Sequence, residues 1–230
     1  MADAGTDTIA VRHGAKSQTL IDRLGGAIRD GRFAPGQRLI EAEITSEFGV
    51  SRGPVREAFR KLSADGLVEI IPNKGAMVRR LSRREALELF EIRTELEALA
   101  ARRAANAISD SCLRSAFERA TAPIWRDEPR YSTADYICEN RTFHSAIYEA
   151  AGNRQLFRLN EQLQLSLIMA QLNPVLTSHV IASSLDEHRT IARAILDGNP
   201  GAAERTVRKH LKRAIDVVRA APNDLFSKDR

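Results

Sequence analysis

The sequence predicts a mainly α-helical protein of two parts, a small α+β part near the N-terminus and a larger part made of helices alone. Apolar residues recur at intervals of three and four along most of the 230 residues, which is the period of an amphipathic helix. Two strand-like runs, 67–71 and 76–80, flank Pro72-Asn73-Lys74-Gly75, which has the chemistry of a hairpin turn. Beyond residue 82 the sequence is rich in Ala, Leu, Glu and Arg and carries no further strand signal.

The first element predicted after the N-terminus is a helix that begins at Ser17. Residues 1–16 are polar and lack periodicity, so we expect them to form a flexible leader. From Ser17 onward, apolar residues follow helical spacing until Asp30-Gly31, a pair that ends helices. A turn through Phe33-Ala34-Pro35-Gly36 follows.

Two short helices and the hairpin complete the N-terminal part. A helix over 41–48 is followed by Gly49, which suits a helix C-cap, and Ser51 suits the N-cap of a third helix that stops at Asp65-Gly66. Helix, turn, helix and hairpin in this order predict a winged helix-turn-helix, which we assign to residues 17–82.

Six helices are predicted after residue 82, and we expect them to form one all-α bundle. Ser82 and the charged residues that follow it mark the boundary. The bundle is assigned to residues 83–222, and residues 223–230 are left as a tail. The helices are expected at 83–107, 110–121, 132–150, 154–172, 180–197 and 200–220.

The formal net charge is +5, and the excess of cations is concentrated around the hairpin. Between Ser51 and Arg80 there are seven Lys and Arg against three Asp and Glu, whereas residues 83–230 carry 22 against 20. A concentrated basic region favours a polyanionic partner.

Cysteine use and hydropathy predict a cytoplasmic protein with no membrane partner. Cys112 and Cys138 show neither a disulfide framework nor a zinc-knuckle spacing, and the N-terminus has no secretory signal. Residues 162–185 carry no formal charge, but only about half of them are apolar, which favours a buried helix and a loop over a membrane span.

Three arginines recur at intervals of four in the predicted third helix. Arg52, Arg56 and Arg60 lie within about 80° of each other on a helical wheel, beside the apolar stripe. The planar fork of arginine can bind guanine O6 and N7, or a phosphate, through two hydrogen bonds. A solvated basic face would give the same pattern, but the short helix before it and the hairpin after it favour binding of double-stranded DNA.

The hairpin tip offers further residues for the same surface. Lys74 lies between Asn73 and Gly75, whose small or flexible backbone would let the tip approach a phosphate or the minor groove, although an ordinary turn explains both residues equally well. The segment 49–53 also matches the Gly-x-Ser-x-Gly elbow of esterases, but no strand leads into its serine. The residues assigned to the DNA-binding surface are Ser51, Arg52, Arg56, Arg60, Asn73, Lys74 and Gly75.

Three of the five histidines fall on the inward faces of separate predicted helices. They are His144, His188 and His210, and Asn140 lies one turn before His144. A single inward histidine is usually a core residue, whereas three with a nearby amide oxygen could hold a first-row metal, because neutral imidazole is a common ligand of Zn²⁺ and Ni²⁺. Spacing alone leaves both interpretations open.

Arg93 falls on the inward face of the first helix of the bundle. A buried guanidinium needs a nearby anion. That anion is either an internal carboxylate such as Glu97 or the carboxylate of a bound ligand, and the sequence favours neither.

The N-terminal part resembles the DNA-binding domain of GntR-superfamily transcription regulators. The resemblance rests on the nearly continuous stretch PGQRLIEAEITSEFGVSRGPVREAFRKLSADGLVEIIPNKGAMVRRL. It implies that Arg52 and Arg56 contact bases and phosphates and that Asn73-Lys74-Gly75 forms the tip of the wing.

The C-terminal part resembles the all-helical FCD effector domain of the FadR subfamily, most closely its shorter VanR-type branch. The segments that carry this resemblance are EIRTELEALAARRAA, ENRTFHSAIYEAAGN, DEHRTIARAILDGN and ERTVRKHLKRAI. It implies a small carboxylate effector that meets Arg93, and a divalent metal, Zn or Ni, held by Asn140, His144, His188 and His210. The first of these ligands is commonly Asp, and the neutral Asn140 is a weaker donor.

These expectations describe a homodimeric, metabolite-responsive transcription regulator, a repressor more readily than an activator, that binds a pseudo-palindromic operator and performs no catalysis. Two alternatives are open. One is a metal-dependent hydrolase or lyase that uses the three histidines, and the other is an architectural DNA-binding protein with an inert helical domain.

Overall fold

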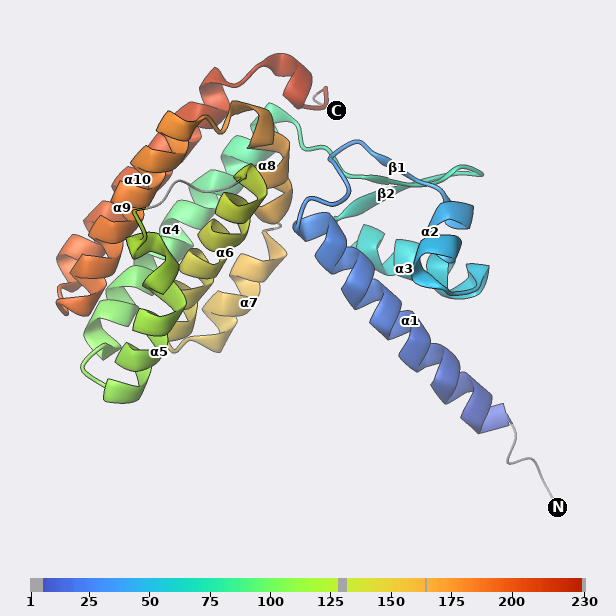
Figure 1. Cartoon of the computed structure of the whole chain (residues 1–230), viewed down its shortest axis with the longest axis horizontal. Coiled ribbons are helices and arrows are strands. Elements are labelled where there is room, and N and C mark those ends of the chain that lie inside the picture. The colour runs from blue at the N-terminus through green and yellow to red at the C-terminus, as the bar shows by residue number, and fades with distance from the viewer. Residues whose placement is uncertain (1–5, 128–131, 164, 229–230) are drawn as a thin grey trace. The chain divides into compact units, whose positions relative to one another are not determined.

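The computed structural model describes residues 6–127, 132–163 and 165–228. The chain is mainly helical with a small sheet, as the sequence predicted, and it divides into two compact units, 1–80 and 81–230 (Figure 1). The division falls two residues before the boundary that the sequence suggested.

The first unit packs three helices against a three-stranded antiparallel sheet with the order β1-β3-β2. Its elements are α1 (Thr6–Arg29), β1 (Arg38–Leu39), α2 (Glu41–Phe48), α3 (Arg52–Ala64), β2 (Val68–Ile71) and β3 (Gly75–Val78). Burial of apolar side chains from helices and strands holds the unit together. They include Leu24, Ile28, Leu39, Ile44, Val55, Phe59, Leu62, Val68 and Val78. This arrangement is the predicted winged helix-turn-helix.

Helix α1 begins at Thr6, eleven residues before the start at Ser17 that the sequence predicted. The C-terminal half of this helix is held by packing, because its side chains Leu20, Leu24 and Ile28 are buried. Once that half is fixed by packing, extending the helix toward the N-terminus costs little, because nucleation is the expensive step. The added residues contain no proline that would stop the extension.

Helices α2 and α3 meet at the predicted turn. Gly49 adopts a left-handed φ of 66°, and its N–H donates to the carbonyl of Thr45 and closes α2. Ser51 has the extended backbone of an N-cap residue, but its side chain makes no capping hydrogen bond. Helix α3 thus starts where expected without help from the serine hydroxyl.

The hairpin turn depends on two residues with positive φ. Asn73 has a φ of 61° and Gly75 a φ of 90°, and the N–H of Lys74 donates to the carbonyl of Ile71 at 3.0 Å. Strand β3 also passes close to β1 at Gly75, where an added Cβ would overlap the carbonyl oxygen of Leu39. Glycine is therefore required both by its backbone angle and by the close approach of β1.

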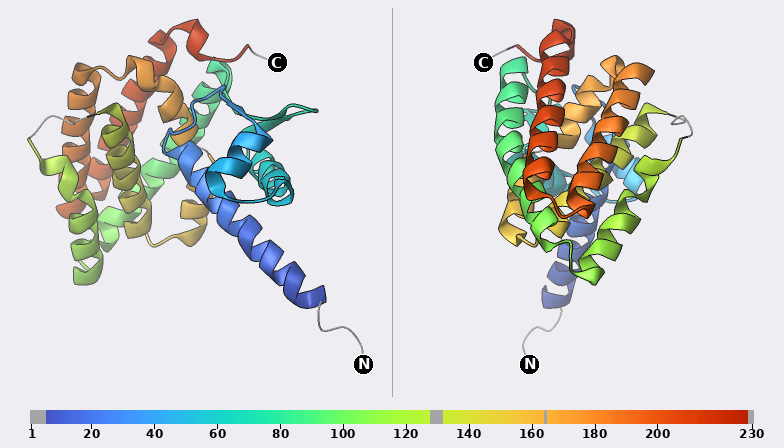
Figure 2. Two further views of the ribbon diagram at one scale, coloured as in Figure 1. Left: turned by 45° about the vertical axis from the view of Figure 1, so that its right-hand side comes forward. Right: turned by 90° about the vertical axis from the view of Figure 1, so that its left-hand side faces the viewer.

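The second unit contains the long helix α4, which packs against α6, α9 and α10 (Figure 2). Its α-helices are α4 (Arg83–Ala107), α5 (Ser111–Thr121), α6 (Thr133–Ala150), α7 (Arg154–Gln162), α8 (Leu165–Leu172), α9 (Ser178–Leu196) and α10 (Pro200–Ala220). Short 3-10 turns follow α5, α8 and α10 at Ala122–Trp125, Asn173–Val175 and Asn223–Leu225. Within the described ranges, no helix combines the length and apolarity that crossing a membrane requires.

The segment 154–172 was expected to be one helix but forms two, α7 and α8. At the end of α7 the N–H of Leu163 donates to the carbonyl of Asn160 at 3.1 Å, a tight bond to the third residue back that closes the final turn. The segment contains neither glycine nor proline, so its local sequence carries no stop signal. The bundle consequently has seven α-helices in its described part, one more than predicted.

Residues 223–228 are packed onto the bundle, which corrects their assignment to a tail. Phe226 is buried, and the N–H of Ser227 donates to the carbonyl of Leu81 at 3.1 Å. The guanidinium of Arg83 lies over the Phe226 ring and donates to carbonyls that end helix α10. Those carbonyls have no partner within their own helix, so the arginine supplies the donors that they need.

We expect Gly75→Ala to destabilise the first unit more than Gly49→Ala does. At Gly49 the left-handed backbone alone costs about 1 to 2 kcal/mol, because the space around it is open. At Gly75 the same cost is increased by the overlap with Leu39, which must move. Calorimetric melting of the full-length chain with each substitution tests this order, and equal shifts in Tm would contradict it.

Candidate functional site

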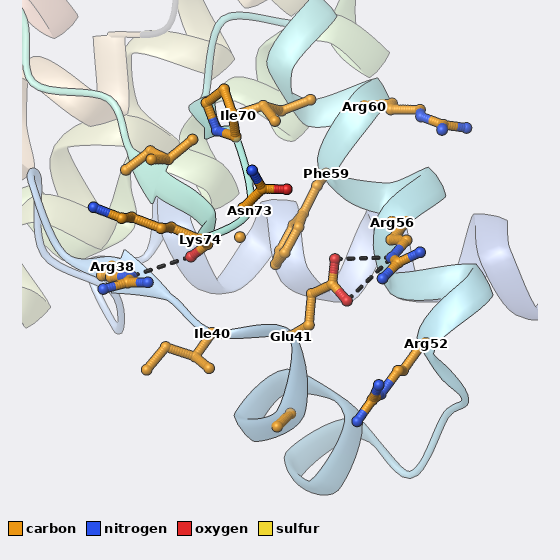
Figure 3. A pocket seen from close by; sticks show the side chains of 14 residues that line it. Arg38, Ile40, Glu41, Arg52, Arg56, Phe59, Arg60, Ile70, Asn73 and Lys74 are labelled. Carbon is orange, nitrogen blue, oxygen red and sulfur yellow. Dashed lines mark hydrogen bonds and ion pairs between the residues drawn. The ribbon is translucent and has the colours of Figure 1, made fainter.

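A groove of about 660 Å³ lies in the first unit between helix α3 and the β2–β3 hairpin (Figure 3). Helix α3 is anchored by its buried face, which includes Val55, Ala58 and Leu62. Its exposed arginines Arg52, Arg56 and Arg60 line the groove, together with Asn73, Lys74 and Gly75 of the hairpin. The structure therefore brings six of the seven residues predicted for DNA binding to one surface. The seventh, Ser51, is exposed just before α3 and is not among the lining residues.

Arg56 is held by a carboxylate from the preceding helix. Its Nε donates to both carboxylate oxygens of Glu41, at 3.0 and 3.1 Å. Figure 3 shows these two hydrogen bonds, with Glu41 on α2 pointing toward Arg56 on α3. Because the side chain of Arg56 is 62% exposed, this ion pair adds less than about 1 kcal/mol to stability. Its effect is on the position of the guanidinium.

A fifth cation lines the groove from strand β1. Arg38 donates from Nε to the carbonyl of Lys74 at 3.1 Å and so ties β1 to the tip of the hairpin. Ile40 and Ile70, which are 39% and 48% exposed, add apolar surface beside these cations. A groove with cationic and apolar surface suits a duplex, whose phosphates and sugar or base edges offer both kinds of contact.

Sequence reasoning missed both Arg38 and Glu41. Arg38 lies in a two-residue strand that has no periodicity to reveal it. Glu41 is the first residue of α2, and its contact with Arg56 spans 15 positions. Only the packing of α2 against α3 makes the pair visible.

In the second unit, three helices bring the predicted histidines together. His144 of α6, His188 of α9 and His210 of α10 are all buried, and one ring nitrogen of each lies within 4.8 Å of the others. The expectation that they face inward is confirmed. A set of three imidazoles at this spacing could form a metal site.

Two carboxylate contacts, one buried and one partly buried, orient the rings of His144 and His210. Nδ1 of His144 lies 2.5 Å from Glu97 Oε1, and Nδ1 of His210 lies 2.7 Å from Glu187 Oε2. An imidazole that donates its Nδ1–H to a carboxylate presents the lone pair of Nε2, and Nε2 of His144 has no partner in the structure. Nδ1 of His188 is likewise buried without a partner. These two unpaired buried nitrogens belong to a cluster of three imidazoles whose spacing fits a divalent metal.

The rings of His144 and His188 are in the neutral state that metal binding needs. Burial lowers the pKa of His144 to about 4 and outweighs the opposing effect of Glu97. Burial also holds the pKa of His188 well below its ordinary value. Burial raises the pKa of Glu97, but His144 and Arg93 outweigh it and bring that pKa to about 2, so the carboxylate is ionised.

The charge of Arg93 is neutralised by a carboxylate inside the protein. Its Nε donates to Glu97 Oε2 at 2.9 Å, one turn along α4, and both side chains are buried. This is the internal partner that the sequence offered as one possibility. Glu97 thus accepts hydrogen bonds from Arg93 and His144 through different oxygens.

A small cavity of about 30 Å³ adjoins the histidines and is lined partly by Arg93, Asn140 and His210. Arg213 also lines it, and its Nε donates to both oxygens of Glu187 at 2.8 Å. The remaining wall is largely apolar and includes Phe90, Met169, Leu172 and Val217. The cavity thus combines two guanidinium groups with a hydrophobic wall.

Sequence reasoning missed Arg213, Glu187 and the role of Glu97 toward His144. Glu187 is adjacent to His188, so on a helix it does not share that residue's direction, and it meets His210 on α10 instead. This contact depends on how α9 and α10 pack.

Comparison with known proteins identifies both units. Residues 16–78 match the model of bacterial regulatory proteins of the gntR family, and residues 88–213 match the FCD domain. The chain belongs to the gntR family and carries an FCD domain. It is 32% identical, over 80% of each chain, to a protein of Paenarthrobacter nicotinovorans named "Probable D-xylose utilization operon transcriptional repressor".

Further gntR-type relatives span most of the chain. The HTH-type transcriptional repressor GlaR of Escherichia coli is 26% identical over 83% of this chain and 90% of its own. The solved structure of E. coli McbR/YncC has the same fold, with a TM-score of 0.73 over 89% of this chain and 97% of that one, at 20% identity. As a gntR-family member with an FCD domain, the chain is a DNA-binding transcription regulator that responds to a metabolite.

We expect Glu97→Gln to lower the free energy of unfolding by about 3 to 5 kcal/mol, because Arg93 would be left as a buried charge without its anion. Glu118→Gln is the matched control, since Glu118 forms the same i,i+4 pair with Arg114 at 3.0 Å on the surface. That loss should stay below about 1 kcal/mol. Urea denaturation of both variants measures the difference, and equal effects would show that Glu97 does not stabilise the buried charge.

Proposed function

We propose that this chain is a homodimeric repressor of the FadR subfamily, in its VanR-like branch, that releases DNA in response to a small carboxylate. The observation that carries the proposal is the pairing, in one chain, of a groove with five cations and a buried histidine cluster beside two arginines. Residues 17–82 would bind DNA and residues 83–222 the effector. The effector would bind one of two placements of the DNA-binding domains more tightly and so shift their populations.

In the proposed DNA complex, helix α3 enters the major groove and the hairpin follows the phosphate backbone. Arg52 and Arg56 would contact base edges and phosphates, Arg60 would add charge beside them, and Lys74 would meet a phosphate. A single short helix reads few base pairs, so twofold symmetry of a dimer would double the readout and require a pseudo-palindromic operator.

We expect Arg56→Ala to reduce discrimination between operator and unrelated DNA by about 1 to 3 kcal/mol, the contribution of a bidentate contact to a base. Lys74→Ala should weaken binding to all sequences alike and reduce the salt dependence by about one phosphate contact. Duplexes selected from a random pool by the wild-type protein supply the operator for titrations at several salt concentrations. Wild-type discrimination by Arg56→Ala would assign base recognition to another surface.

In the helical domain, we propose that His144, His188 and His210 hold a divalent metal, Zn²⁺ or Ni²⁺, with Asn140 as a further donor. Glu97 is balanced by Arg93 and Glu187 by Arg213, so these two pairs leave the charge of a metal uncompensated. The bound metal would supply a Lewis-acidic contact for an anion.

The proposed effector is a small mono- or dicarboxylate, such as a sugar acid or hydroxy acid. The contacts described for Arg93 and Arg213 use Nε, which leaves the terminal amines to meet a carboxylate. The cavity of about 30 Å³ holds little more than one water, so the effector would be small and would widen its wall on entry. The name of the P. nicotinovorans relative, which refers to D-xylose utilization, is compatible with a sugar-derived acid.

We expect His188→Ala to lower the bound metal and to blunt the effector response while basal DNA binding persists, because a buried ligand is removed from the second unit and the proposed DNA-binding residues all belong to the first. His179→Ala, an exposed change on the same helix, should leave both unchanged. Elemental analysis measures the metal, and calorimetry with a panel of carboxylates before and after chelation measures the response. Full effector affinity in metal-free protein would leave the histidines as core residues.

The enzyme alternative requires a base beside the histidines that is free to accept a proton. Glu97 and Glu187, the carboxylates in contact with the histidines, are each held by an arginine. Turnover assays with metal present test this alternative directly. An inert helical domain, in turn, predicts no thermal shift with any carboxylate.

A further inference from the structure

The ion pair between Glu41 and Arg56 has a geometry that matters for DNA reading. Glu41 engages the Nε edge of the guanidinium with both of its oxygens. A bidentate contact to guanine O6 and N7 can instead use the two terminal amines at the end of the fork. One arginine can therefore be held by Glu41 and present its end to a base at the same time.

The anchor itself is well fixed. Glu41 is the first residue of α2, where a carboxylate is favoured by the helix dipole, and its side chain is only 27% exposed. Its backbone carbonyl accepts a hydrogen bond from the hydroxyl of Thr45 at 2.6 Å, and the side chain of Ile44, one turn further on, is buried. The more exposed arginine is thus held by the less mobile partner.

Holding Arg56 in advance changes the cost of recognition. A free arginine side chain loses about 2 kcal/mol of rotamer entropy when it is fixed on a base. Part of that cost is removed when the guanidinium is already positioned before DNA arrives. The benefit applies only where a base offers matching acceptors, so it favours selective over general binding.

The charge of Glu41 acts in the same direction. It is the one acidic residue among those that line a groove with five cations. A carboxylate there repels phosphates and competes with them for Arg56, which weakens binding to DNA of any sequence. A surface built only for affinity would gain from a neutral residue at this position.

We propose that Glu41 is a positioning residue that determines specificity, holding Arg56 by its Nε edge so that its terminal amines read a guanine, and opposing contacts of Arg56 with phosphates. This inference rests on the proposed role of Arg56 in DNA recognition. It assigns to an acidic residue a function in binding a polyanion.

Three substitutions separate positioning from charge. Glu41→Asp keeps the charge but shortens the side chain by one carbon, so it should lose the hold on Arg56. Glu41→Gln removes the charge and one acceptor oxygen. Glu43→Gln removes the same charge from the same helical turn. Glu43 is exposed and is not among the residues that line the groove.

The measurement is the ratio of affinities of the full-length protein for two duplexes of equal length, one selected from a random pool by the wild-type protein and one unrelated. Glu41→Gln should reduce this ratio about tenfold, with several-fold tighter binding to the unrelated duplex and a salt dependence steeper by about one contact, as Arg56 turns to phosphates. Glu41→Asp should reduce the ratio with little change on the unrelated duplex. Glu43→Gln should leave the ratio within about twofold, since it removes no contact of Arg56.

A merely structural role of Glu41 would lower both affinities together and also lower Tm. An unchanged ratio in Glu41→Asp, or an equal loss in Glu43→Gln, would overturn the inference. Adding Arg56→Ala to Glu41→Gln gives the cross-check, because the double variant should have the same ratio of affinities as Arg56→Ala alone. If Arg56→Ala itself leaves the ratio unchanged, the proposed recognition role of Arg56 fails, and that outcome is distinct from a failure confined to Glu41.

Discussion

The pairing of the buried Glu97 carboxylate with Arg93 and His144 is the interaction on which the second unit depends. Glu97 is fully buried on the long helix α4, where it neutralises Arg93 and fixes the ring of His144. Without it, a guanidinium would be buried without an anion and the imidazole would lose the contact that sets its tautomer. One side chain thus links the stability of the bundle to the geometry of its histidine cluster.

The same device recurs at both sites of the molecule. Glu41, Glu97 and Glu187 each hold an arginine through Nε, and the arginines are Arg56, Arg93 and Arg213. An arginine held at Nε has a fixed position, and the N–H groups of its Nη1 and Nη2 atoms can still donate hydrogen bonds to another anion. The groove of the first unit and the cavity of the second unit thus share one way of positioning an arginine.

The start of the second unit is bonded to helices that carry the cavity and histidine-cluster residues. The backbone of Leu81 exchanges two hydrogen bonds with the side chain of Gln171, which lies on α8 between the cavity residues Met169 and Leu172. Arg83 donates to the last carbonyls of α10, the helix of His210. A change in the position of α8 or α10 would therefore move Leu81 and Arg83, which begin the second unit directly after residue 80.

The sequence by itself determined the winged helix-turn-helix, the arginine row of α3 and the inward direction of His144, His188 and His210, because helical periodicity and turn chemistry are local properties. Tertiary structure alone decided the break after α7, the extension of α1 to Thr6, and the partners of the charged side chains. The contacts of Glu41 with Arg56 and of Glu187 with His210 join separate helices. No local pattern encodes such pairs, since they exist only once burial of the apolar faces has fixed how the helices cross.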